Sequence, residues 1–135
     1  MLTYGDGVCD VDISELFAFH KKHGKIATLT AVTRDQSKGA LDIAFDNTVR
    51  SFREKHMQDS ITINAGYMVL EPEVFDLLED DDTVLETDVL SVLAERGELM
   101  SYSHKGFWQC MDTLQEKQLL ERLYNDQQAP WVSWE

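Results

Sequence analysis

The chain has 135 residues, of which 43% are hydrophobic and 27% charged, a balance typical of one globular domain with a single core. Its 25 acidic residues against 12 Lys and Arg give a formal net charge of −13 at pH 7. Nucleic acids and anionic membranes require clustered cations, so this charge argues against both as partners. No apolar run approaches a membrane span and no secretory leader pattern is present, so we expect a cytoplasmic protein. Cys9 and Cys110 lack CxxC spacing and are expected to be reduced thiols rather than a disulfide or a zinc site.

The first part of the chain predicts a strand, a helix and a second strand. A short strand over residues 2–4 reaches a turn at residues 5–7. Asp12 has the sequence context of a helix N-cap, and Gly24 can end that helix. Residues 25–32 form an apolar run typical of a buried strand. Strand, helix and strand within about thirty residues predict a βαβ unit with a right-handed crossover.

The rest of the chain continues the alternation of strands and helices. The further predicted elements are a β-hairpin over 39–54, a strand over 61–70, a helix from 71 to about 78, a helix capped by Thr87 or Asp88 and ending at Gly97, strands over 99–104 and 107–111, and a helix from about 113 to 124. The last helix is expected to turn four leucines inward, namely Leu114, Leu119, Leu120 and Leu123. The aromatic tail at 130–135 is expected to pack on the body. We therefore expect one α/β domain over residues 1–135, with a mixed sheet flanked by helices.

Asp6 and Asp112 each end a short apolar stretch and precede a segment that can form a helix. An acid at the carboxyl end of a strand lies where open α/β sheets bind their ligands. Two such acids from distant parts of the chain can share one Mg²⁺, because Mg²⁺ takes few protein carboxylates and completes its shell with phosphate and water. The pair suits chemistry on a nucleoside triphosphate. Composition and spacing alone lead to a metal- or phosphate-binding α/β domain and no further.

Three other places could contact a substrate, and each also has a structural explanation. Lys55, which follows Glu54 at the end of the hairpin, can meet a phosphate, although its spacing favours an exposed ion pair. Asn64 in an apolar strand can bind a sugar hydroxyl or pair with neighbouring backbone, and Gly66 beside it leaves room for a ligand. Glu86 can face a ligand, but helix capping explains residues 86–88 adequately.

Six motifs occur in order along the chain. From the N-terminus they are Thr3-Tyr4-Gly5-Asp6-Gly7-Val8, residues 19–25, residues 39–43, Ser51-Phe52-Arg53-Glu54-Lys55, residues 106–113 and Ala129-Pro130-Trp131. Together they resemble the sugar-1-phosphate nucleotidyltransferases, and specifically the glucose-1-phosphate cytidylyltransferases, over essentially the whole chain. Members of that family make CDP-glucose and pyrophosphate from CTP and glucose 1-phosphate.

The resemblance implies a Rossmann-like nucleotide-diphospho-sugar transferase fold, with Mg²⁺ as cofactor and a sugar phosphate as ligand. The implied site consists of Asp6 and Asp112 as Mg²⁺-binding catalytic acids, Lys55 on the sugar phosphate with Glu54 nearby, and Asn64 and Gly66 in the sugar pocket. The implied reaction is an in-line attack by a sugar-phosphate oxygen on the α-phosphorus of CTP, in which positioning and charge neutralisation do most of the work.

The chain departs from the family both locally and in extent. Family members commonly have Glu-Lys-Pro and Asn-Gly-Gly where this chain has Glu54-Lys55-His56 and Asn64-Ala65-Gly66. They also carry about an equal length of chain before the motif that contains Asp6, including a Gly-rich G-G-x-G-T-R-L loop that cradles phosphates. We therefore expect a C-terminal half that lacks the nucleotide-binding half and is inactive alone.

Two other readings stay open. The chain could be a stand-alone, non-catalytic module that associates with itself, or an enzyme half completed in trans by a separate N-terminal half. Without the first strands of the sheet, backbone edges at residues 2–4 and 25–32 are expected to be uncovered. Such edges pair with another chain, so we expect a homo-oligomer, most simply a two-fold dimer.

Overall fold

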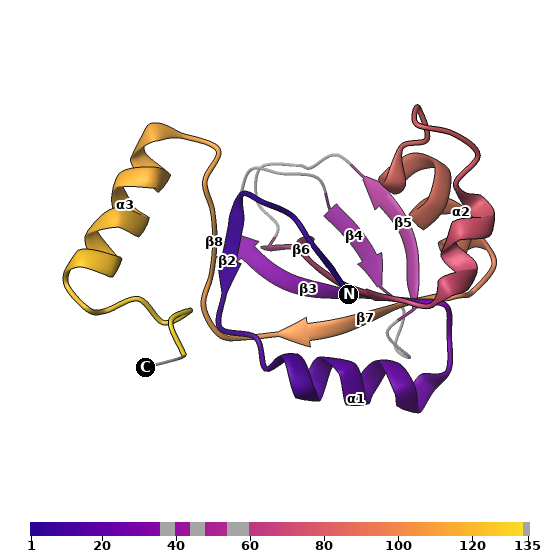
Figure 1. Cartoon of the computed structure of the whole chain (residues 1–135), viewed down its shortest axis with the longest axis horizontal. Coiled ribbons are helices and arrows are strands. Elements are labelled where there is room, and N and C mark those ends of the chain that lie inside the picture. Colours follow the sequence, from indigo (N-terminus) through magenta and orange to yellow (C-terminus); the bar gives the residue numbers. More distant parts are fainter. Residues whose placement is uncertain (36–39, 44–47, 54–59, 134–135) are drawn as a thin grey trace.

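A mixed four-stranded sheet lies at the centre of the computed structural model, which describes residues 1–35, 40–43, 48–53 and 60–133 (Figure 1). Within these residues the strand order is β1 (Leu2–Thr3), β6 (Ser60–Leu70), β3 (Ala27–Asp35) and β7 (Leu99–His104). Strand β6 pairs antiparallel with β1 and with β3, whereas β3 pairs parallel with β7. The sheet is therefore mixed, and helices accompany it, as the sequence predicts.

Two short antiparallel ribbons complete the described strands. The first pairs β2 (Gly7–Cys9) with β8 (Trp108–Cys110), and the second pairs β4 (Ala40–Ile43) with β5 (Val49–Arg53). The second ribbon is the predicted hairpin. Its turn, together with Glu54 and Lys55, lies outside the described residues.

Helix α1 (Ile13–His23) begins and ends where its sequence predicts. The Asp12 side chain accepts the backbone N–H groups of Ser14 and Glu15 at 2.8 and 3.0 Å, which satisfies donors that a helix start leaves unpaired. Gly24 ends the helix in the left-handed region, with a φ of 66°. The helix runs along the sheet and links β2 to β3 (Figure 1).

The two strands of the predicted βαβ unit are not neighbours. Strands β1 and β3 both pair antiparallel with β6, so they run parallel to each other with β6 between them. Strand β3 is an interior strand, paired with β6 on one edge and β7 on the other. The expectation of an uncovered edge at residues 25–32 is therefore wrong. Strand β1 does stand at the end of the described sheet.

The segment after β6 differs in detail from its prediction. The helix after Glu71 is a short 3-10 helix, η1 (Pro72–Leu77), and a π-helical segment, η2 (Leu85–Leu90), continues directly into α2 (Ser91–Glu95). The N-cap of η2 is Val84, so the prediction of Thr87 or Asp88 as the cap is wrong. Asp88 nevertheless accepts the backbone N–H of Val84 at 2.7 Å from within the helix.

The largest described core cluster joins the sheet to η1, η2 and α2. Its buried members are Ala27, Leu29, Ala31, Val49, Met68, Val74, Val89, Leu90, Leu93 and Leu99. Burying a large aliphatic side chain contributes about 1.5–3 kcal/mol, so this cluster is the main source of stability. A smaller cluster of Val32, Ile61, Ile63 and Ala65 carries Trp108 at its margin.

Helix α3 (Leu114–Asn125) stands apart from that core, beyond the β2–β8 ribbon (Figure 1). Thr113 and Glu116 form a capping box at its start. None of its residues is buried. Leu114 and Leu119 are 65% and 38% exposed, so the prediction that they face inward is wrong, whereas Leu120 and Leu123 are half-buried. The aromatic tail does return to the body, because Trp131 stacks on Phe107 with ring centroids 5.4 Å apart. Among the described residues, no helix combines the length and apolar character that crossing a membrane requires.

Candidate functional site

The β2–β8 ribbon brings the loops of Asp6 and Asp112 together. Gly7 pairs with Cys110 at the end of the ribbon, and the backbone N–H of Met111 then donates to the carbonyl oxygen of Asp6 at 2.7 Å. Asp112 follows Met111 directly, and both aspartates are exposed. Two acids 106 residues apart in the sequence thus lie on neighbouring loops at one end of the ribbon.

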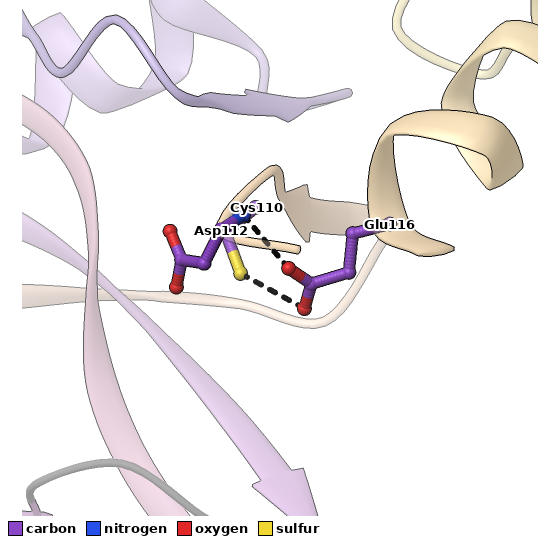
Figure 2. A group of neighbouring side chains, drawn as sticks. All are labelled: Cys110, Asp112 and Glu116. Carbon is purple, nitrogen blue, oxygen red and sulfur yellow. Dashed lines mark hydrogen bonds between the residues drawn. The ribbon is translucent and has the colours of Figure 1, made fainter. Parts of the chain in front are cut away.

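The backbone at Asp112 is held by Glu116 from the first turn of α3 (Figure 2). One carboxylate oxygen of Glu116 accepts the N–H groups of Asp112 and Thr113 at 2.8 and 3.0 Å. The other accepts the Cys110 thiol at 3.5 Å. In the view of Figure 2, the carboxylates of Asp112 and Glu116 lie on opposite sides of the Cys110 thiol.

Cys110, Asp112 and Glu116 offer ligand atoms within 4.8 Å of one another, so their fit to a metal can be judged. Mg²⁺ binds hard oxygen ligands, and a thiol such as that of Cys110 is unsuited to it. Glu116 is already engaged with two backbone N–H groups and a thiol. The carboxylates of Asp6 and Asp112 are the oxygen donors in these two loops that suit Mg²⁺, and their role as its ligands stays a prediction.

A second group of predicted residues meets around Tyr4, two residues before Asp6. The Tyr4 hydroxyl donates to Glu86 Oε1 at 2.5 Å and accepts from Asn64 Nδ2 at 3.4 Å. The backbone N–H of Tyr4 donates to the carbonyl of Gly66 at 2.8 Å. One tyrosine therefore contacts three residues that were predicted separately from the sequence, namely Asn64, Gly66 and Glu86. Tyr4 itself is not among the residues predicted from the sequence.

Gly66 is required by its backbone and by the Tyr4 ring. Its φ of +82° is one that residues with a side chain rarely adopt. A Cβ at this position would lie 2.7 Å from Tyr4 Cδ2, which is too close for carbon atoms. Tyr4 therefore fills the space that a Cβ at Gly66 would need, and the place of Gly66 in the sugar pocket stays a prediction.

The structure also bears on the two alternatives for Asn64. Its side-chain oxygen accepts the backbone N–H of Gly66 at 2.9 Å, which is the local pairing that the sequence left open. Its amide nitrogen faces the Tyr4 hydroxyl. Burial, followed by the hydrogen bond to Glu86, raises the pKa of Tyr4, and the charge of Asp6 acts in the same direction.

Lys55 and Glu54 lie outside the described residues, so their predicted contacts with a sugar phosphate stay predictions. The indole N–H of Trp108 donates to the carbonyl of Ala65 at 2.8 Å, and its ring packs against the smaller core cluster. Cys9 and Cys110 are both buried, and they are not joined in a disulfide.

Comparison with known proteins gives these observations a context. Residues 1–128 match the protein family described as nucleotidyl transferase. The glucose-1-phosphate cytidylyltransferase of Salmonella typhimurium is 51% identical over 135 residues, which are 100% of this chain and 52% of that protein. The mannose-1-phosphate guanyltransferase of Saccharomyces cerevisiae is 38% identical over 120 residues, covering 85% of this chain and 33% of that protein.

Solved structures show the same architecture. The crystal structure of HddC from Yersinia pseudotuberculosis superposes with a TM-score of 0.75 at 21% identity, covering 89% of this chain and 52% of that one. This likeness confirms the predicted fold class and carries nothing beyond the fold. The chain spans about half the length of the curated cytidylyltransferases that it matches.

Proposed function

The chain belongs to the nucleotidyl transferase family, and on this basis we propose that it forms the sugar-phosphate and Mg²⁺-binding side of a glucose-1-phosphate cytidylyltransferase. The 51% identity to the Salmonella typhimurium protein extends over the whole of this chain. It supports CTP and glucose 1-phosphate as the substrates. We further propose that residues 1–135 act as one α/β domain. The complete reaction would join CTP and glucose 1-phosphate into CDP-glucose with release of pyrophosphate.

In this proposal each predicted residue has a limited task. Asp6 and Asp112 hold Mg²⁺, which when bound neutralises charge on the phosphate oxygens. Lys55 meets the phosphate of the sugar, and Asn64 and Glu86 contact its hydroxyls. A phosphate oxygen of the sugar attacks the α-phosphorus of CTP, and the bond from that phosphorus to the oxygen of the leaving pyrophosphate breaks. The residues of this chain contribute by holding the attacking oxygen in place.

Nucleotide binding is proposed to lie outside these 135 residues. Their sequence contains no G-G-x-G-T-R-L run, and a Gly-rich loop of that kind supplies the backbone N–H groups that cradle phosphates. About half the length of the curated relatives lies outside the match. We therefore propose that the isolated chain retains a half-site for the sugar phosphate and does not turn over.

The observation that carries the proposal is the meeting of the two acid loops through the Met111–Asp6 hydrogen bond. The test is a calorimetric titration of the chain with glucose 1-phosphate in the presence of Mg²⁺. We expect weak binding that Lys55→Ala reduces about tenfold, because a charge-assisted hydrogen bond is lost. Lys22→Ala is the matched control, since it removes one exposed positive charge from the last turn of α1. Equal affinities for the wild type and Lys55→Ala would overturn the proposed phosphate contact.

A further inference from the structure

Tyr4 connects the residues assigned to the sugar with the loop assigned to the metal. It contacts Glu86, Asn64 and Gly66, and it stands two residues before Asp6. We propose that the Tyr4 hydroxyl is a positioning group for sugar recognition, because it fixes the orientation of the Asn64 amide and the Glu86 carboxylate. This inference rests on the proposed function and extends it to a residue that carries no predicted role.

The direction of every hydrogen bond in this group is determined. The backbone N–H of Gly66 can only donate, so the Asn64 atom that it meets at 2.9 Å is the side-chain oxygen. The Asn64 amide nitrogen then donates to the Tyr4 hydroxyl, and the single hydroxyl proton goes to Glu86. Donation thus runs in one direction from Gly66 to the Glu86 carboxylate, and such chains strengthen each bond within them.

This chain of hydrogen bonds from Gly66 to Glu86 leaves one acceptor and one donor for a ligand. Among the described residues, Glu86 Oε2 and the second amide hydrogen of Asn64 have no hydrogen-bond partner of their own. Glu86 is exposed and Asn64 is half-buried. A sugar hydroxyl can donate to the carboxylate while another accepts from the amide. An acceptor and a donor held by one tyrosine fit two hydroxyls of a sugar.

The ring and the hydroxyl of Tyr4 have separate roles. The ring covers Gly66, and the backbone N–H of Tyr4 is bonded to the Gly66 carbonyl, so Tyr4→Phe preserves both contacts. The hydroxyl alone reaches Glu86 and Asn64.

The experiment compares Tyr4→Phe with Tyr124→Phe, which removes a hydroxyl from a tyrosine that is 63% exposed on α3. Both variants are titrated with glucose 1-phosphate and with inorganic phosphate. We expect Tyr4→Phe to lower the affinity for glucose 1-phosphate about tenfold and to leave phosphate binding within about twofold of the wild type, because only the sugar contacts are disturbed. Tyr124→Phe should change neither. Equal loss for both ligands, or no loss for the sugar phosphate, overturns the proposal.

A second readout needs no ligand. The side-chain amide resonances of Asn64 should shift in Tyr4→Phe and stay in place in Tyr124→Phe, as measured by ¹H–¹⁵N NMR. Unchanged Asn64 resonances would overturn the positioning role even if a binding difference were found. If the wild-type chain binds no sugar phosphate at all, the proposed function fails, and this ligand-free readout still decides whether Tyr4 positions Asn64.

Discussion

Replacing Gly66 with alanine tests whether the space beside this residue belongs to Tyr4 or to a ligand. The added Cβ would lie 2.7 Å from Tyr4 Cδ2 and 3.0 Å from Tyr4 Cγ. It would also occupy a backbone conformation with φ of +82°. The unfavourable φ costs about 1–2 kcal/mol, and an extra carbon in a packed site costs about 1–3 kcal/mol. We therefore expect Gly66→Ala to lower the free energy of unfolding by about 2–5 kcal/mol.

Urea denaturation followed by far-UV circular dichroism measures this loss, and Gly5→Ala supplies the control. A Cβ at Gly5 meets nothing within 4 Å, and its φ is not positive, so that variant should stay within about 0.5 kcal/mol of the wild type. A total stability of about 5–15 kcal/mol, typical of folded domains, makes the expected difference large.

A double-mutant cycle separates the two contributions at Gly66. In a Tyr4→Ala background the clash with the ring is absent, so Gly66→Ala should cost only the backbone share of about 1–2 kcal/mol. The coupling between the two positions should then be about 1–3 kcal/mol. If Gly66→Ala unfolds like Gly5→Ala but no longer binds sugar phosphate, the glycine leaves room for a ligand and the packing argument is wrong.

Three further predictions concern proton uptake, turnover and association. His23 Nδ1 accepts the backbone N–H of Lys25, and burial, followed by the charge of His20, lowers its pKa below the ordinary 6.5. As the pH drops through 6.5, His23 gains a proton in the unfolded chain before it does so in the folded chain, so the free energy of unfolding should fall. His23→Gln should flatten that fall. Parallel pH profiles for the variant and the wild type would contradict this. The isolated chain should release no pyrophosphate from CTP, glucose 1-phosphate and Mg²⁺, and turnover that disappears in Asp6→Ala would refute the half-site account. Sedimentation should show a dimer, because β1 pairs on one side only in the described sheet. Met1 and Phe75, which are 58% and 69% exposed, also line an apolar pocket beside β1. A stable monomer at micromolar concentration would contradict the dimer.

Local signals explain why much of the fold could be predicted. Asp12 and Gly24 determine the ends of α1 through contacts within a few residues, and both were readable from the sequence. The long strand β6 and the hairpin strands β4 and β5 were visible as apolar or alternating runs. These signals do not specify which strands become neighbours. The placement of β6 between β1 and β3 follows from long-range pairing, and the βαβ pattern alone suggested adjacency.

Helix α3 shows a different limit of sequence reasoning. The spacing of its leucines predicts an apolar face, and the structure confirms the predicted start at about residue 113, with Thr113 as the N-cap. Periodicity says nothing of whether another element covers that face. Leu114 and Leu119 are 65% and 38% exposed, so this part of the apolar face is uncovered in the described chain, whereas Leu120 and Leu123 are half-buried.

Some residues of the candidate site could likewise be predicted from the sequence, whereas others could be found only in the structure. Asp6 and Asp112 were visible because each acid follows an apolar stretch, and the ribbon that joins their loops could be seen only in the structure. Tyr4 gave no signal, because its partner Glu86 lies 82 residues away and a tyrosine at a strand end is ordinary in a core. The contacts of Glu116 with the backbone N–H of Asp112 and with the Cys110 thiol were not predicted and could be seen only in the structure.

The central claim is that Asp6 and Asp112 form one cation site, and paramagnetic broadening by Mn²⁺ tests it most directly, since Mn²⁺ shares the oxygen ligands of Mg²⁺. In ¹H–¹⁵N spectra of the chain, the amides of residues 5–7 and 111–113 should broaden first. Asp6→Ala or Asp112→Ala should abolish that broadening, whereas the exposed control Asp76→Ala should preserve it. Broadening centred on the acidic run at 79–82, or unchanged in both site variants, would contradict the account.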